Sequence, residues 1–175
     1  MTSPAPAPRP SSGEYAPYYE KYVSLVPVGD VVETLERQVA ETLALLRELT
    51  EEQGASRYAP GKWSVKEVIG HLIDAERVFA YRALRFARGD RTPLPGFEQD
   101  DYVTAGNFDA RPLADLADEF EHVRRSTVAL LRPLGEVEWG RSGTASDKEV
   151  SVRAIAYIIA GHELHHMRIL RERYL

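Results

Sequence analysis

Four long segments of the chain carry apolar residues at alternating steps of three and four, a spacing that places them on one face of an α-helix. These stripes predict four helices, near 31–50, 64–88, 112–134 and 151–173. No segment shows the alternation of apolar and polar residues that marks a half-buried β-strand, and no internal repeat is visible. Helices of this length bury their apolar faces by packing against one another. The expected fold is therefore all-α, a four-helix bundle.

The helix starts and one long connection refine this expectation. Asp30 with Glu33, and Ser64 with Glu67, form the capping-box pattern at the starts of the first two predicted helices. The connection between helices 2 and 3, residues 89–111, is unusually long for a compact domain. We expect a long crossover loop there, which permits a topology other than up-down-up-down. Its aromatic residues are interpreted as anchors of a surface crossover; the alternative is that the loop walls a site.

The composition fits one domain and excludes several classes of partner. Residues 1–13 are rich in Pro, Ala and Ser and predict a disordered N-terminal tail, followed by a single domain over 14–175. A net charge of -5 argues against a nucleic-acid partner, which prefers a basic face. The longest apolar run, residues 154–160, is too short to span a membrane, and the N-terminus lacks the apolar segment of a secretory signal. The absence of cysteine excludes disulfides, thiolate ligands and a cysteine nucleophile, and it fits a cytoplasmic protein.

Near the C-terminus, residues 162–166 spell HELHH and match H-E-x-x-H, the helical signature of zinc peptidases. Such enzymes take a third ligand farther downstream and bind extended peptides along a sheet. Only nine residues follow His166, and no sheet is predicted. The match to a peptidase is therefore interpreted as coincidence.

The positions of these histidines on the predicted helix favour a different metal site. Relative to Ile155, His162 and His166 fall within about 20° of the centre of the apolar stripe, whereas His165 lies about 80° off. Stacked imidazoles in an apolar core need a partner for every ring nitrogen, and a metal ion accepts one lone pair from each residue. We favour the metal over a pair of hydrogen-bonded core histidines. With His71 on the facing helix, the predicted ligands are His71, His162 and His166, and a fourth position stays open as in catalytic zinc sites.

Three stretches give the chain a resemblance to a known family. They are PGKWSVKEVIGHLIDAERVFAYRALRFARGD, TPLPGF and VSVRAIAYIIAGHELHHMRILRERYL. On these stretches, residues 15–175 resemble the DinB/YfiT-like superfamily of metal-binding four-helix bundles, often labelled metal-dependent hydrolases. The resemblance implies that the family's first histidine corresponds to His71 and its HxxxH pair to His162 and His166. It also implies a homodimer with one divalent ion per chain, zinc or nickel. Members with assigned activities are often transferases or isomerases that use a low-molecular-weight thiol such as bacillithiol or mycothiol.

The leading functional hypothesis is the transfer of such a thiol to a small electrophile. A metal held by the three histidines would lower the pKa of the thiol, and the sulfur would arrive with the cosubstrate because the chain has no cysteine. The first alternative is hydrolysis of a small ester or amide by an activated water molecule. The second is a non-catalytic bundle that the metal stabilises. Glu163, beside the predicted ligands, could act as a catalytic base or support the ligands from behind, but a glutamate that simply faces solvent is the preferred interpretation.

Two clusters of side chains have no assigned role in the proposed reaction. Four arginines of the second helix could attract an anionic thiol, although a solvated basic face is the preferred interpretation: Arg77, Arg82, Arg85 and Arg88. Four tyrosines precede the first helix too densely for a disordered tail: Tyr15, Tyr18, Tyr19 and Tyr22. We expect the tyrosine segment to pack on the bundle, near the site.

Overall fold

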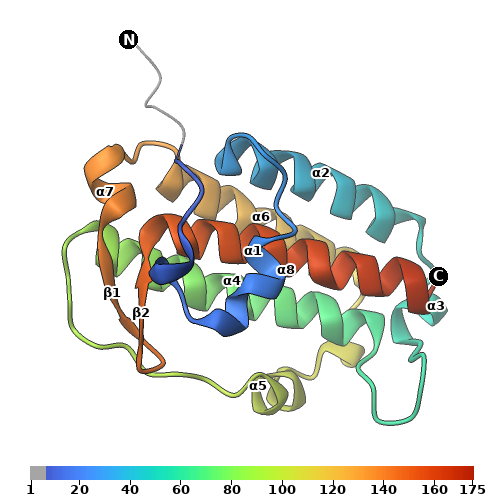
Figure 1. The fold of residues 1–175 in the computed structure, drawn as a ribbon. Helices are drawn as coiled ribbons and strands as arrows, with labels where there is room; N and C mark the ends of the chain where they lie inside the picture. Colours follow the sequence, from blue (N-terminus) through green and yellow to red (C-terminus); the bar gives the residue numbers. More distant parts are fainter. Residues whose placement is uncertain (1–6) are drawn as a thin grey trace.

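The computed structural model describes residues 7–175, and its four longest helices pack as a bundle (Figure 1). They are α2 (Val31–Glu48), α4 (Val65–Ala87), α6 (Leu113–Leu131) and α8 (Val152–Arg173). Their ends differ from the predicted ranges by three residues at most. The predicted four-helix bundle is confirmed. Within the described part of the chain, none of the helices combines the length and the apolar character needed to cross a membrane.

Side-chain caps fix where the first two long helices begin. At α4, the Ser64 hydroxyl accepts from the backbone N–H of Glu67, and the Glu67 carboxylate accepts from the backbone N–H of Ser64, as predicted. At α2, Asp30 accepts from the backbone N–H of Val32 at 2.8 Å, so this helix has a cap without the reciprocal bond predicted from Glu33. Each cap satisfies N–H groups that have no partner inside the helix.

The helices do not follow an up-down-up-down order. Gln38 and Thr42 on α2 bond to Ala160 and Glu163 on α8, so these two helices run in the same direction. Figure 1 shows α4 and α6 running together in the opposite direction. Since α2 and α4 each pack against both α6 and α8, α2 and α4 lie across the diagonal of the bundle. The crossover from α4 to α6 therefore returns along the length of the bundle, as parallel helices require (Figure 1).

The crossover is not the plain loop that the sequence predicted. It contains α5 (Gln99–Gly106) and the short 3-10 helix η3 (Phe108–Ala110), separated by Asn107 with φ +47°. The buried ring of Phe108 lies directly over Gly70 of α4, where an added Cβ would come within 2.3 Å of the ring. Helix α5 is short and polar, so its sequence has no apolar stripe to predict it.

A β-hairpin corrects the expectation of a wholly helical chain. Strands β1 (Ser142–Ala145) and β2 (Lys148–Ser151) pair antiparallel through a turn at Ser146 and Asp147, both with positive φ. Strands of four residues offer too little alternation to be detected, and the turn lacks the Asn-Gly or Asp-Gly signal of a two-residue hairpin. Leu94 of the crossover forms a bridge with Ala145, so the hairpin and the crossover are joined. Two further short helices are α3 (Glu51–Ala55) and α7 (Glu136–Gly140).

The N-terminal segment packs on α8. It forms η1 (Ser12–Glu14), η2 (Pro17–Tyr19) and α1 (Glu20–Val23), and α1 contacts α8 along the bundle surface (Figure 1). Of the predicted tail, residues 1–6 lie outside the described residues. Over residues 7–13 the structure differs from the predicted disorder, because Ala7 is buried and Arg9 donates to the carbonyl of Val23 at 2.9 Å. The predicted packing of the tyrosine segment on the bundle is confirmed.

Candidate metal centre

The bundle brings the three predicted histidines together. His71 lies in the second turn of α4, and His162 and His166 lie one turn apart on the antiparallel helix α8. The Nε2 atom of His162 is 3.0 Å from Nε2 of His71 and 3.1 Å from Nε2 of His166. Of the described residues, these three form the group whose ligand atoms all lie within 4.8 Å of one another.

Burial keeps these imidazoles neutral. It lowers the pKa of His71 to about 4 and that of His166 to about 3, and it lowers the pKa of His162 well below its usual value. A neutral Nε2 offers either one N–H or one lone pair, so Nε2 of His162 cannot satisfy both neighbours at once. One ion could accept a lone pair from all three residues, and two nitrogen ligands of a tetrahedral zinc ion lie about 3.3 Å apart. The residues therefore fit a divalent metal ion.

Aromatic rings pack around the cluster and hold the imidazoles in place. The Trp63 ring lies 4.8 Å from His71, and the Tyr22 ring lies 5.1 Å from His162, measured between ring centroids. His165 is half-buried against Tyr22 at 5.3 Å and stays outside the cluster, as its angle on the helix predicted.

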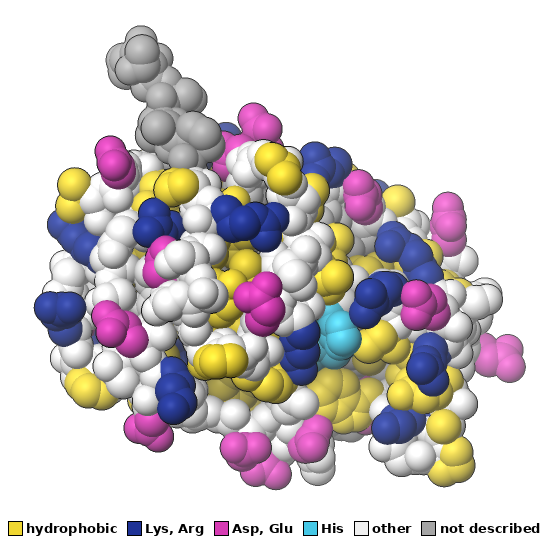
Figure 2. Space-filling view, in the orientation of Figure 1, with side chains coloured by type: hydrophobic (Ala, Val, Ile, Leu, Met, Phe, Trp, Pro, Cys, Tyr) yellow, Lys and Arg dark blue, Asp and Glu magenta, His cyan; other side chains and the backbone are white. Residues whose placement is uncertain are grey.

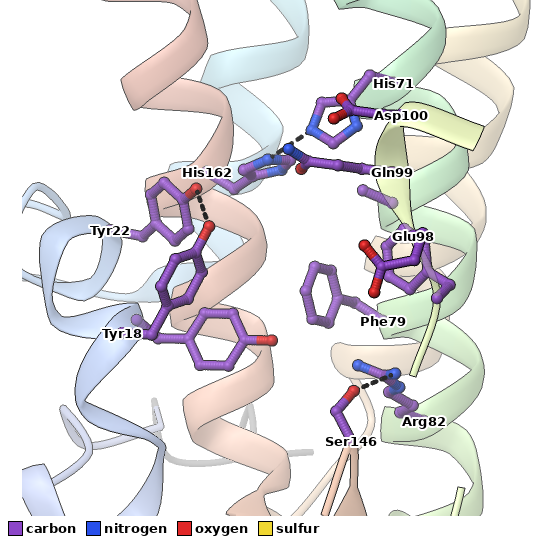
Figure 3. Close-up of a pocket in the computed structure, with 13 residues that line it drawn as sticks. Tyr18, Tyr22, His71, Phe79, Arg82, Glu98, Gln99, Asp100, Ser146 and His162 are labelled. Carbon is purple, nitrogen blue, oxygen red and sulfur yellow. Dashed lines mark hydrogen bonds between the residues drawn. The ribbon is translucent and has the colours of Figure 1, made fainter. Parts of the chain in front are cut away.

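A cavity of about 290 Å³ opens beside the cluster. Figure 2 shows a histidine side chain in a hollow between apolar and basic side chains. Five parts of the chain wall the cavity: Tyr18, Tyr19 and Tyr22 of the N-terminal segment, one face of α4, residues 97–100 of the crossover, Ser146 at the hairpin turn, and His162 of α8 (Figure 3). The crossover, preferred from the sequence as a surface connection, is thus a wall of this cavity, which was the alternative interpretation.

The position of Glu163 differs from the solvent-facing one that the sequence favoured. It is 2% exposed, so it does not face solvent. Its Oε1 accepts from the Thr42 hydroxyl at 2.6 Å, and its Oε2 lies 2.7 Å from Nη2 of Arg124. Arg124 in turn donates to both carboxylate oxygens of Glu76, at 2.9 and 2.8 Å. Held in this buried network by the Thr42 hydroxyl and the Arg124 guanidinium, Glu163 is poorly placed to accept a proton at the histidine cluster.

One of the four arginines departs from the predicted basic face. Arg82 is 3% exposed, and its Nη2 donates to the carbonyl of Pro95 at 2.9 Å and to the hydroxyl of Ser146 at 3.0 Å (Figure 3). The other three lie at the surface, wholly or in part: Arg77, Arg85 and Arg88. Helical periodicity could not reveal the burial of Arg82, because the crossover and the hairpin cover it and neither was predicted to lie there.

Comparisons with known proteins agree on the family. The model of the DinB superfamily matches residues 34–170. A protein of Oceanobacillus iheyensis named "Putative metal-dependent hydrolase" is 25% identical over 138 residues, which cover 78% of this chain and 77% of the relative.

Two solved structures share the fold. YfiT from Bacillus subtilis, described as a probable metal-dependent hydrolase with an unusual four-helix bundle topology, has a TM-score of 0.66 at 15% identity, covering 93% of this chain and 91% of its own. The mycothiol-dependent maleylpyruvate isomerase has a TM-score of 0.65 at 14% identity, covering 83% of this chain and 61% of its own. With most of its length matched by the family model, the chain belongs to the DinB superfamily.

Proposed function

We propose that this protein is a metal-dependent enzyme that acts on a small molecule at His71, His162 and His166. One observation carries the proposal: three neutral imidazole nitrogens converge beside a cavity that is open to solvent. Structural zinc sites are closed by four protein ligands, whereas catalytic sites keep one position open. Three ligand groups converge here among residues 7–175, which supports a catalytic ion over one that only stabilises the bundle.

Within this proposal, thiol transfer to a small electrophile is the first candidate. A bound zinc or nickel ion would supply the Lewis acidity that lowers the pKa of a thiol or of water at the open position. Because the three histidine ligands are neutral, they would not offset the positive charge of a bound metal ion. This charge favours an anionic thiolate over a neutral ligand at the open position. The rings of Phe79 and Phe97 on the cavity wall suit the apolar body of an electrophile. The chain has no cysteine, so the sulfur would come from a cosubstrate of the bacillithiol or mycothiol type.

Hydrolysis of a small ester or amide is the second candidate. The carboxylates of Glu98 and Asp100 line the cavity and are exposed (Figure 3). A water nucleophile must lose a proton as it attacks, and a carboxylate within reach can accept it. The name of the Oceanobacillus relative supports the same chemistry.

The cellular location and the oligomeric state of the enzyme are also part of what we propose. We expect a cytoplasmic homodimer without a nucleic-acid partner, supported by the net charge of -5 and by the family resemblance. Light scattering on the zinc-loaded protein tests the dimer, since a mass of one chain, 19.7 kDa, would contradict it.

Product formation by zinc-loaded protein separates the two chemistries. In one reaction bacillithiol or mycothiol is offered with 1-chloro-2,4-dinitrobenzene, and in the other p-nitrophenyl acetate is offered without a thiol. We expect thiol conjugation above the uncatalysed rate, lost in His166→Ala and retained in His165→Ala. Thiol-independent ester cleavage that depends on His166 would establish the hydrolase instead. If neither product forms above background in a fully loaded protein across a panel of such substrates, the enzymatic proposal is wrong.

A further inference from the structure

Two arginines of the described residues are buried in this bundle, and one of the two forms an ion pair with carboxylates. Arg124 contacts Glu76 and Glu163, which raise its pKa. Arg82 is 3% exposed, and among residues 7–175 no carboxylate oxygen lies within 4.0 Å of its guanidinium. Burial lowers the pKa of Arg82, and the Tyr19 hydroxyl beside it offsets this effect only in part. A buried charge without a counter-charge is unfavourable, so Arg82 leaves a place for an anion.

Some N–H groups of the Arg82 guanidinium are available to donate to a ligand. Its Nη2 is bonded to Pro95 and Ser146, which fixes the plane of the fork between the crossover and the hairpin. No described carbonyl or carboxylate accepts from its Nε or Nη1, and neither atom is sealed away from solvent. The space beside them is the cavity that also reaches the histidines (Figure 3). The guanidinium is therefore held in a fixed orientation, and its Nε and Nη1 donors remain available to a ligand in the cavity.

Arg82 and the histidine cluster lie at two ends of one wall. His71, Ala75, Phe79 and Arg82 follow one another at steps of four, four and three, which places them along one face of α4. The Phe79 ring centroid is 6.5 Å from that of His162 and 5.6 Å from Cζ of Arg82. A single aromatic ring thus separates the guanidinium from the imidazole. A small molecule can reach both ends at once.

We infer that Arg82, fixed by Ser146, binds the carboxylate of a small molecule whose other end reaches the three-histidine centre. With Nη2 engaged, Nη1 or Nε can still donate a charge-assisted hydrogen bond to a carboxylate oxygen, and the carboxylate supplies the missing negative charge. A monoanion fits better than a phosphate dianion, because Glu98 and Asp100 at the cavity wall would repel the second charge. The ring of Phe97, 5.9 Å from Cζ of Arg82, favours an apolar body between the two ends. This inference rests on the proposed function and narrows its substrate class to carboxylate-bearing molecules.

Binding of a matched acid and amide tests the inference. Isothermal titration calorimetry compares 3-phenylpropionate with 3-phenylpropionamide on zinc-loaded and on metal-free protein. We expect the acid to bind at least about tenfold more tightly than the amide in both forms, because one charge-assisted hydrogen bond is gained. Equal affinities for acid and amide in metal-free wild-type protein would overturn the inference. So would a preference for the acid that appears only with zinc and does not depend on Arg82, since the metal would then hold the carboxylate.

Substitutions at Arg82 test whether this residue binds the carboxylate, and a second substitution serves if the first one unfolds the protein. Arg82→Gln should abolish the preference for the acid, and Arg88→Gln, which removes an exposed charge directly after the end of the same helix, should retain it. Should Arg82→Gln unfold, Arg82→Lys keeps the charge but loses the planar guanidinium that Pro95 and Ser146 hold in place, and it is expected to reduce the preference by about tenfold. Full preference in a folded Arg82 variant would contradict the assignment. Zinc content measured on the same samples separates this outcome from failure of the proposed function, because losing the carboxylate site leaves the histidines intact.

The carboxylate can belong to the thiol cosubstrate or to the second substrate. Cobalt-loaded protein titrated with 6-mercaptohexanoate and 6-mercaptohexanol reports sulfur ligation by its charge-transfer band. An Arg82-dependent preference for the charged thiol would assign the carboxylate to the cosubstrate. Equal affinities for the two thiols, with the Arg82-dependent preference for 3-phenylpropionate retained, would assign it to the other substrate.

Discussion

Two polar clusters lie in the core of this bundle, and neighbouring residues of α8 divide between them. His162 belongs to the histidine cluster and Glu163 to the network of Arg124 and Glu76. The histidine cluster borders a cavity and cannot satisfy its own nitrogens. The network places one guanidinium between two carboxylates and is closed to solvent. A polar cluster left incomplete beside open space is suited to a ligand, whereas a sealed network that bridges several helices is suited to holding them together.

The closed network connects all four helices. Glu76 comes from α4, Arg124 from α6 and Glu163 from α8, and α2 contributes the Thr42 hydroxyl and the carbonyl of Leu35, 3.1 Å from Nη1 of Arg124. Interactions in the low-dielectric core are strong only when every partner is present. We infer that the network fixes the register of the helices, and thereby the separation of His71 from His162 and His166.

Breaking the closed network should have the largest effect on stability. Arg124→Met leaves two buried carboxylates without their cation, and we expect the free energy of unfolding to fall by about 3–5 kcal/mol. Urea denaturation of metal-free protein measures this. Arg125→Met is the matched control, because the Arg125 side chain is 71% exposed and the change should stay within about 0.5 kcal/mol. A fall of under 1 kcal/mol for Arg124→Met would show that the network does not hold the bundle.

The open cluster should stabilise the fold only through the metal. With free zinc at a hundred times the dissociation constant, we expect wild-type protein to gain about 2.7 kcal/mol over its metal-free form. In His71→Ala this gain should vanish, because one of the three ligands is missing. Paired urea curves with zinc and with chelator provide the measurement. An equal gain in the variant would place the zinc elsewhere on the chain.

A third polar contact, nearer the surface, should respond to acid. Burial raises the pKa of Glu14, but hydrogen bonds from Arg153, Ser11 and Ser151 outweigh it and lower the pKa from 4.5 to about 2. Because the folded-state pKa is depressed, the stabilisation is complete above pH 4.5 and is lost as the pH falls toward 2. Discounted for partial exposure, we expect about 1–2 kcal/mol between wild type and Glu14→Gln at pH 7. Thermal melts should show the gap closing between pH 4.5 and 2; a gap that does not change with pH would contradict the ion pair.

The features that were predicted correctly are those that the residues of one helix determine by themselves. Long apolar stripes located α2, α4, α6 and α8, and the i, i+4 spacing of His162 and His166 at the centre of a stripe pointed to the metal centre. Both signals lie within one helix, so no knowledge of its neighbours is needed.

The features that were missed depend on contacts between elements. Glu163 sits at the edge of its own stripe, and its burial follows from Arg124 and Thr42 on other helices. Arg82 is buried by the hairpin and by the crossover, whose short polar segments have no periodicity to predict them. The environment of a side chain at the edge of a stripe is set by whichever element packs there, and one helix's periodicity does not contain that information.

Zinc affinity in two variants of the same helix turn tests the central claim most directly. His165 and His166 are adjacent in sequence, and only His166 points into the cluster. By calorimetric titration, wild-type protein and His165→Ala should each bind one zinc ion per chain with similar affinity. His166→Ala should bind more than about a hundredfold more weakly, since losing a ligand exceeds the effect of losing a supporting residue. Equal affinities in His165→Ala and His166→Ala would contradict the account of the open cluster as a metal centre.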